Sequence, residues 1–238
     1  MGEIILIHGA WHGAWCWNKV LPLLQKQGHK TLAPDLPGHG SNRVCDTAVT
    51  LDQYTDFICD LVDKTNQPVT LVGHSMSGIV ISRVAEIMPE KINKLIFVSG
   101  FLLKNGQTIL EVAKKDTDGM VLPNLVYSRN RKFASIREDL IRDVFYQDCT
   151  EADYEQAKLK LTEQSLKPLS TPISISAERC GKVAKSYIAC SSDRAISYRS
   201  QLEMITNMPC EQTITLDSGH SPFISMPELF VNKLLQLG

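Results

Sequence analysis

The sequence predicts an α/β fold built on a mostly parallel, doubly wound sheet of about six strands. Short apolar runs recur along the chain, and several are apolar on consecutive residues, as in strands that are covered on both faces. These runs alternate with stretches of helical pattern, which is typical of parallel strands joined by helical crossovers. The predicted strands span residues 4–7, 31–33, 69–72, 95–98, 186–189 and 213–216.

Residues that commonly begin or end helices mark the crossovers. Gly28 follows the first helical stretch and Pro89 follows the third, and both residue types commonly stand after a helix end. Thr50 and Gln53 have the spacing of a capping box in front of the second stretch. The predicted helices span residues 17–27, 51–65 and 77–88, with a last helix from near Pro227 to residue 238.

The alternation breaks down between about residues 101 and 180, which we call the cap segment. We expect it to be a helical insertion over the sheet, with helices such as residues 134–145 and 152–166. Residues 1–100 and 181–238 then form the core of a single domain. A chain of 238 residues with 43% hydrophobic residues is long enough for one sizeable core.

The charge balance and the first residues of the chain bear on its partners and its location. Lys and Arg number 25 against 26 for Asp and Glu, a formal net charge of -1. We therefore expect no nucleic-acid partner and no membrane partner, since both need a basic surface. The first apolar run, residues 4–7, is far too short for a signal peptide or a membrane span, which predicts a cytoplasmic protein.

The seven cysteines are scattered without C-x-x-C pairs, and their odd number argues against a complete disulfide framework. No histidine or cysteine has the spacing of zinc ligands. We expect reduced, mostly buried thiols, no metal site and no cofactor.

Ser75 is the candidate nucleophile. It lies in the sequence G-H-S-M-S-G, from Gly73 to Gly78, between a predicted strand and a predicted helix. A nucleophile elbow needs this setting, in which a sharp turn lifts the serine hydroxyl clear of the sheet. Ser77 stands where the second glycine of G-x-S-x-G is usual, so the motif is incomplete. The alternative interpretation is an ordinary glycine-flanked turn.

A serine nucleophile needs a histidine base that a carboxylate orients. His220 is the candidate base because it alone among the six histidines follows the last predicted strand. Asp193 follows the preceding strand and is the preferred acid, since a neighbouring strand end approaches the imidazole from the side. Asp217, on the loop of His220 itself, stays open as an alternative.

The oxyanion hole is expected to use the backbone N–H groups of Met76 and Ala10. Met76 follows the nucleophile, and Ala10 lies in the turn after the first strand. The expected substrate pocket consists of Gly9, Trp11, His12, Leu122 and Tyr127. Other apolar residues of the cap segment that could line it are Phe101, Leu102, Leu125, Phe133 and Phe145.

Four motifs make the chain resemble the plant methylesterase and hydroxynitrile lyase family of α/β-hydrolases and its bacterial esterase relatives. The resemblance implies an α/β-hydrolase fold with a helical cap, esterase roles for the residues above, and a homodimer. Lyases of this family have threonine in place of Gly9 and lysine in place of Ser221, so the resemblance favours the esterase branch. The motifs are I-H-G-A-W-H-G-A-W at 7–15, G-H-S-M-S-G at 73–78, C-S-S-D at 190–193 and G-H at 219–220.

The sequence therefore predicts a serine carboxylic ester hydrolase that acts on small, largely apolar esters, with methyl esters as one option. Two alternatives are a C–C lyase or cyclase on the same scaffold, with His220 as base, and a non-catalytic small-ligand receptor. Multiple turnover of esters would separate the first hypothesis from both alternatives.

Overall fold

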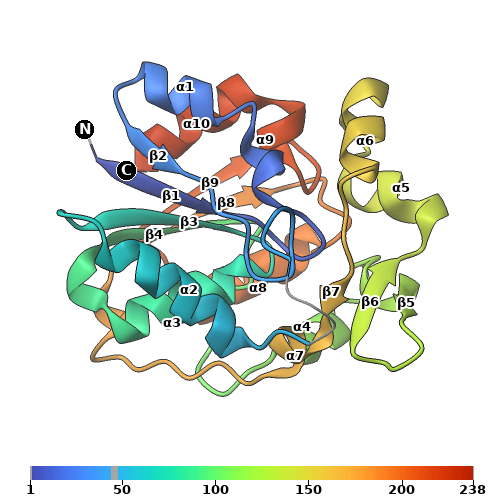
Figure 1. The fold of residues 1–238 in the computed structure, drawn as a ribbon, viewed down its shortest axis with the longest axis horizontal. Helices are drawn as coiled ribbons and strands as arrows, with labels where there is room; N and C mark the ends of the chain where they lie inside the picture. Colours follow the sequence, from blue (N-terminus) through green and yellow to red (C-terminus); the bar gives the residue numbers. More distant parts are fainter. Residues whose placement is uncertain (1, 44–47, 238) are drawn as a thin grey trace.

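The computed structural model of the protein describes residues 2–43 and 48–237. Within these residues it confirms the predicted sheet, whose six strands are parallel and lie in the order β2-β1-β3-β4-β8-β9 (Figure 1). The chain first builds outward to β2, then returns past β1 to β3, which makes the sheet doubly wound. The strands are β1 Glu3–Ile7, β2 Lys30–Leu32, β3 Val69–His74, β4 Ile92–Val98, β8 Lys185–Cys190 and β9 Gln212–Leu216.

Helices cover both faces of this sheet because its central strands are apolar on both sides. All six residues of β8 are buried, as are five of the six in β3. Figure 1 shows α1 and α10 on one face, and α2 and α3 on the other. The carboxyl ends of the parallel strands meet at one edge, where ligands bind in such sheets. The helices of the core are α1 Leu21–Lys26, α2 Leu51–Asp63, α3 Ser77–Ile87, α8 Tyr198–Asn207, α9 Pro222–Ser225 and α10 Pro227–Leu237.

The first predicted helix is shorter than expected. Instead of one helix over residues 17–27, the structure has a 3-10 turn, η1 Ala14–Trp17, followed by α1. Pro22 explains the late start of α1, because proline has no N–H and fits only the first turn of a helix. The end agrees with the sequence, since Gly28 has a φ of +84° just after α1. The predicted capping box of α2 is also present.

The cap segment is not purely helical, which corrects the expectation. Residues 134–145, predicted as one helix, lie partly in strand β6 and partly in helix α5, because residues 133–136 alternate between half-buried and buried as in a strand. Residues 152–166 likewise divide between α6 and β7. Strands β5, β6 and β7 form a small antiparallel sheet beside the main one (Figure 1). The cap elements are α4 Ile109–Lys115, β5 Leu125–Tyr127, β6 Phe133–Ile136, α5 Ile141–Phe145, α6 Glu151–Lys158, β7 Gln164–Ser165 and α7 Leu166–Ser170.

Two further expectations concern thiols and membranes. Six cysteines lie within the described residues and all six are free. Burial raises the pKa of Cys190 to about 12, which keeps this thiol protonated. Cys45 lies outside the described residues. No helix in residues 2–43 and 48–237 is long and apolar enough to cross a membrane.

Candidate active site

Ser75 follows β3 directly and has a φ of +52°, in the left-handed region that non-glycine residues rarely adopt. Three backbone hydrogen bonds hold it there: its N–H donates to the Val98 carbonyl at 3.1 Å, and its carbonyl accepts from the N–H groups of Phe101 at 3.0 Å and Gly78 at 3.1 Å. Such strain persists only where the surrounding structure enforces it, and it clusters at functional sites. The backbone of Ser75 therefore has the conformation that the sequence analysis expects of a nucleophile elbow.

The elbow needs glycine at two positions, and Ser77 is not one of them. A Cβ on Gly73 would lie 2.8 Å from the Ser77 carbonyl oxygen, and one on Gly78 would lie 2.5 Å from the Phe101 carbonyl oxygen. The Ser77 side chain is buried, and its hydroxyl donates a hydrogen bond to the carbonyl of His8. The incomplete motif is tolerated because serine here bonds the neighbouring turn instead of colliding with it.

His220 and Asp193 form a buried pair. The His220 Nδ1 lies 2.8 Å from the Asp193 Oδ2, and both side chains are at most 1% exposed. The other carboxylate oxygen, Oδ1, accepts from the backbone N–H groups of Ala195 at 2.7 Å and Ile196 at 3.0 Å. Gln201 also donates to Oδ2, at 3.2 Å. These bonds fix the carboxylate so that the pair orients the imidazole through Nδ1.

Asp217, the alternative acid, lies elsewhere. Its carboxylate is exposed and accepts from the hydroxyls of Ser191 at 3.1 Å and Ser192 at 3.3 Å. The structure thus pairs His220 with Asp193 and places Asp217 on the surface.

His74 ties the loop of His220 to the elbow. Its Nε2 donates to the His220 carbonyl at 3.0 Å, and the two imidazole centroids are 4.5 Å apart. Since Ser75 follows His74 in the chain, the candidate base and the candidate nucleophile lie on adjoining segments at the carboxyl edge of the sheet.

Ala10 and Met76 line the same cavity as Ser75. Within residues 2–43 and 48–237, the backbone N–H groups of Ala10 and Met76 have no hydrogen-bond partner. Buried backbone donors are rarely left unpaired in proteins, and an oxyanion hole is one of the sites that use such donors. Gly9 allows the close approach, because a Cβ there would lie 2.9 Å from the Ser75 Cβ.

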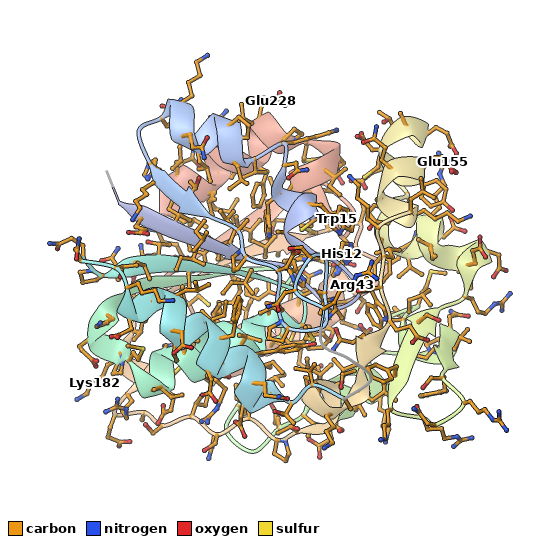
Figure 2. The ribbon with its side chains drawn as sticks, viewed as in Figure 1. His12, Trp15, Arg43, Glu155, Lys182 and Glu228 are labelled. Atoms are coloured by element: carbon orange, nitrogen blue, oxygen red, sulfur yellow. The ribbon has the colours of Figure 1, made fainter. Side chains whose placement is uncertain are left out.

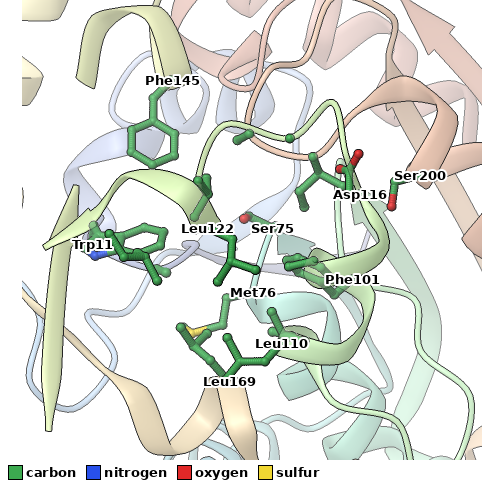
Figure 3. A pocket seen from close by; sticks show the side chains of 18 residues that line it. Trp11, Ser75, Met76, Phe101, Leu110, Asp116, Leu122, Phe145, Leu169 and Ser200 are labelled. Atoms are coloured by element: carbon green, nitrogen blue, oxygen red, sulfur yellow. The ribbon is translucent and has the colours of Figure 1, made fainter. Parts of the chain in front are cut away.

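The cavity over Ser75 is largely apolar. It encloses about 640 Å³ of empty volume, counting space that is open to solvent. Figure 3 shows the Ser75 hydroxyl among the lining side chains. Its lining residues are Ala10, Trp11, Ser75, Met76, Phe101, Ile109, Leu110, Ala113, Asp116, Gly119, Val121, Leu122, Leu125, Phe145, Leu169, Ala195, Ile196 and Ser200.

Of the five expected pocket residues, the structure places Trp11 and Leu122 in the lining. Tyr127 is 51% exposed on β5, outside the cavity. His12 is fully buried behind the lining, where its ring bonds to Tyr146, and Gly9 lies beneath Ser75. The side chains of Tyr127 and His12 point away from the cavity, because neighbouring residues in a strand or tight turn point in different directions.

Several lining residues could not be recognised from the sequence. Ile109, Leu110 and Leu169 come from cap helices whose apolar spacing resembles that of ordinary core helices. Asp116 is a polar exception at the cavity edge, where its carboxylate accepts from the Ser197 hydroxyl at 2.6 Å and from the Ser197 N–H at 2.8 Å.

Four more histidines are buried near the site. Burial lowers the pKa of His12 to about 3 and that of His39 to about 4. It also holds the pKa of His8 and of His74 well below the ordinary value. These four imidazoles are therefore neutral near pH 7.

Comparison with known proteins places this geometry in a family. Residues 4–233 match the model of the alpha/beta hydrolase family. Methylesterase 7 of Arabidopsis thaliana is 30% identical over 99% of this chain and 95% of its own length. Two longer relatives, numbered 11 and 13 in the same plant's methylesterase series, are also 30% identical, and the chain spans 63% and 55% of their length. The crystal structure of polyneuridine aldehyde esterase has a TM-score of 0.89 at 25% identity, over 99% of this chain and 98% of that one.

Proposed function

This chain belongs to the alpha/beta hydrolase family, and from that premise we propose that it is a serine carboxylic ester hydrolase. In this proposal Ser75 is the nucleophile, His220 the general base, and Asp193 the carboxylate that orients the base. The N–H groups of Ala10 and Met76 form the oxyanion hole. The reaction uses no cofactor.

The reaction proceeds through an acyl-enzyme. The Ser75 oxygen attacks the ester carbonyl while His220 Nε2 takes the hydroxyl proton, and the resulting oxyanion accepts hydrogen bonds from the two amides. His220 then protonates the departing alcohol as the C–O bond breaks. Water, deprotonated by the same imidazole, attacks the acyl carbon and releases the carboxylic acid and Ser75.

One observation carries the proposal. The strained Ser75 lines the apolar cavity together with Ala10 and Met76, whose backbone N–H groups have no hydrogen-bond partner among residues 2–43 and 48–237. Unpaired donors beside a serine on an elbow match the requirements of a tetrahedral oxyanion. The buried His220–Asp193 pair supplies the base that such a serine needs.

The cavity supports small, largely apolar esters as substrates. Its walls are mainly aliphatic and aromatic, so an apolar acyl or alcohol group is favoured by burial. The relatives are methylesterases and an esterase by name, and methyl esters are accordingly the first substrates to test.

The test is hydrolysis by the purified protein of p-nitrophenyl acetate and of a panel of methyl and aryl esters. We expect multiple turnover, with Ser75→Ala lowering kcat by about a millionfold. Ser170→Ala is the matched control, because Ser170 is an exposed serine at the end of α7. Full activity in Ser75→Ala would refute the proposal.

Methylesterase 7 and polyneuridine aldehyde esterase are esterases by name, so they favour neither alternative function. A lyase of the resembling family would need threonine at position 9 and lysine at position 221, and this chain has Gly9 and Ser221. A receptor would bind esters without turnover, so the same panel distinguishes it.

A cytoplasmic location, a homodimer and the single-domain boundaries remain predictions within this proposal. Several relatives are described as chloroplastic. Cell fractionation and light scattering of the purified chain measure location and oligomeric state directly.

A further inference from the structure

The turn after β1, residues 8–12, has an unusual pattern of hydrogen bonds. Each of its five consecutive carbonyl groups accepts one bond, and three of the five donors are imidazole rings. The His8 carbonyl accepts from the Ser77 hydroxyl, and the Trp11 carbonyl accepts from the Thr162 N–H at 2.9 Å. The three imidazole donors are His8 Nδ1 to the Gly9 carbonyl at 2.8 Å, His12 Nδ1 to the Ala10 carbonyl at 2.8 Å, and His39 Nδ1 to the His12 carbonyl at 2.9 Å.

The partners fix the protonation of each ring. A carbonyl oxygen only accepts, so each of the three Nδ1 atoms carries the proton. Each Nε2 then accepts a bond, which leaves both nitrogens of every neutral ring satisfied. The donors to Nε2 are the Leu36 N–H for His8 at 3.0 Å, the Tyr146 hydroxyl for His12 at 2.7 Å, and the Tyr54 hydroxyl for His39 at 3.1 Å.

His8 acts on the peptide group that carries the Ala10 N–H. This peptide joins Gly9 to Ala10, and in a planar trans peptide the C=O and the N–H point in opposite directions. Holding the Gly9 carbonyl against the His8 ring therefore aims the Ala10 N–H to the other side. A carbonyl that accepts a hydrogen bond also polarises its own N–H, which strengthens the donor.

His12 acts on the next peptide group. Its Nδ1 holds the Ala10 carbonyl, so Ala10 is fixed on both sides. The following residue, Trp11, has a φ of +64°. Residues other than glycine rarely adopt this backbone conformation, so the surrounding contacts must enforce it. Figure 2 shows His12 beside Trp15, and their rings stack at 5.5 Å. The imidazole of His12 is thus itself held in place.

We propose that His8 and His12 are positioning residues of the oxyanion hole, whose neutral imidazoles aim the Ala10 N–H at the developing oxyanion. The inference rests on the proposed esterase function. Neither ring lines the cavity, so both act through the backbone of Ala10 and not on the substrate.

The experiment compares His8→Leu and His12→Leu with His8→Asn and His12→Asn, using p-nitrophenyl acetate. An asparagine amide N–H can replace the Nδ1 donor, whereas leucine cannot. We expect the leucine variants to lose about tenfold to a hundredfold in kcat with KM within about twofold, because the donor is misaimed but still present. The asparagine variants should recover most of this loss.

A second measurement distinguishes a change in the direction of the Ala10 N–H from a change in the packing of the cavity. Trifluoroacetophenone forms a tetrahedral adduct with a serine nucleophile, and acetophenone reports ordinary binding in the cavity. Inhibition by the trifluoromethyl ketone should weaken by the same factor as kcat/KM in the leucine variants, while acetophenone binding stays unchanged. Equal weakening of both ligands would overturn the proposal.

His39→Leu is the matched control, because it also removes a buried ring from a carbonyl of the turn but not from a peptide group of Ala10. It should lower the Tm and leave kcat within about threefold. An equal fall of kcat in His39→Leu would show a merely structural role and overturn the inference.

Tyr146→Phe keeps the inference testable where the leucine variants do not fold. This change removes the donor to His12 Nε2 and preserves most of the packing. We expect kcat to fall about threefold to tenfold at constant KM, and an unchanged kcat would contradict the role of His12. Full activity in Ser75→Ala would refute the esterase proposal itself, which is a different result from any of these.

Discussion

The carboxyl edge of the sheet and the cap segment contribute different things to the site. The edge supplies Ser75, Asp193 and His220, each held by buried backbone or side-chain bonds. The cap supplies walls, such as Leu122 and Phe145, from short elements with few residues each. For the proposed esterase, we therefore expect the reaction chemistry to depend on the strand ends and the choice of substrate to depend on the cap.

The largest effect on activity is expected from a substitution at the carboxyl edge of the sheet. Asp193→Asn should lower kcat by about ten thousandfold, because the asparagine amide favours the wrong tautomer of His220. Asp217→Asn is the matched control and should keep kcat within about twofold, since Asp217 is exposed and bonds to serines. Ester hydrolysis rates measure both. A loss in Asp217→Asn comparable to that in Asp193→Asn would show that the acid is misassigned.

The dependence of stability on pH also distinguishes the two regions, because all six histidines lie outside the cap segment. The unfolded chain binds protons at the usual imidazole pKa near 6.5, whereas His12 does so at a pKa of about 3 and His39 at about 4. The unfolded state therefore carries more protons below pH 6.5, and stability falls as the pH drops. We expect a loss of about 2 kcal/mol per buried histidine from pH 6.5 to 5, measured by urea unfolding.

The variant His39→Gln checks the origin of this loss. It removes one titrating ring, so the fall of unfolding free energy with acid should become shallower. A stability that stays flat between pH 7 and pH 5 would contradict the burial of neutral histidines.

The smallest effect is expected in the cap. Leu122→Ala enlarges the cavity and should shift the ratio of kcat/KM between longer and shorter esters about tenfold toward the longer ones. Tyr127→Ala is the matched control from the same segment, because its side chain is exposed on β5. An equal shift in both variants would mean that the cap acts by general loosening.

The sheet was predictable because its strands are continuous apolar runs. The largest error in a strand boundary lies in β4, which begins at Ile92, three residues before the predicted start. The start was missed because Asn93 is exposed and Lys94 is half-buried, so the first residues of the strand do not form an apolar run. The cap strands were missed because β5 and β6 are three and four residues long. Strands this short show too few alternations to distinguish them from helices.

The order of Ser75, Asp193 and His220 along the chain could be read from strand ends. The bond from Ser77 to His8 and the imidazole bonds around Ala10 could not, because they join residues that are distant in sequence or depend on ring orientation. Such contacts follow from the packed structure and leave no periodic pattern in the chain.

The glycine requirements of the elbow bear on how relatives of this protein are found. A search for G-x-S-x-G passes over this chain, although the geometry demands glycine at 73 and 78 and accepts serine at 77. Position 77 therefore accepts a small residue other than glycine, whereas the Phe101 backbone leaves no room for a side chain at position 78. A pattern that requires glycine at position 78 instead of position 77 includes this chain.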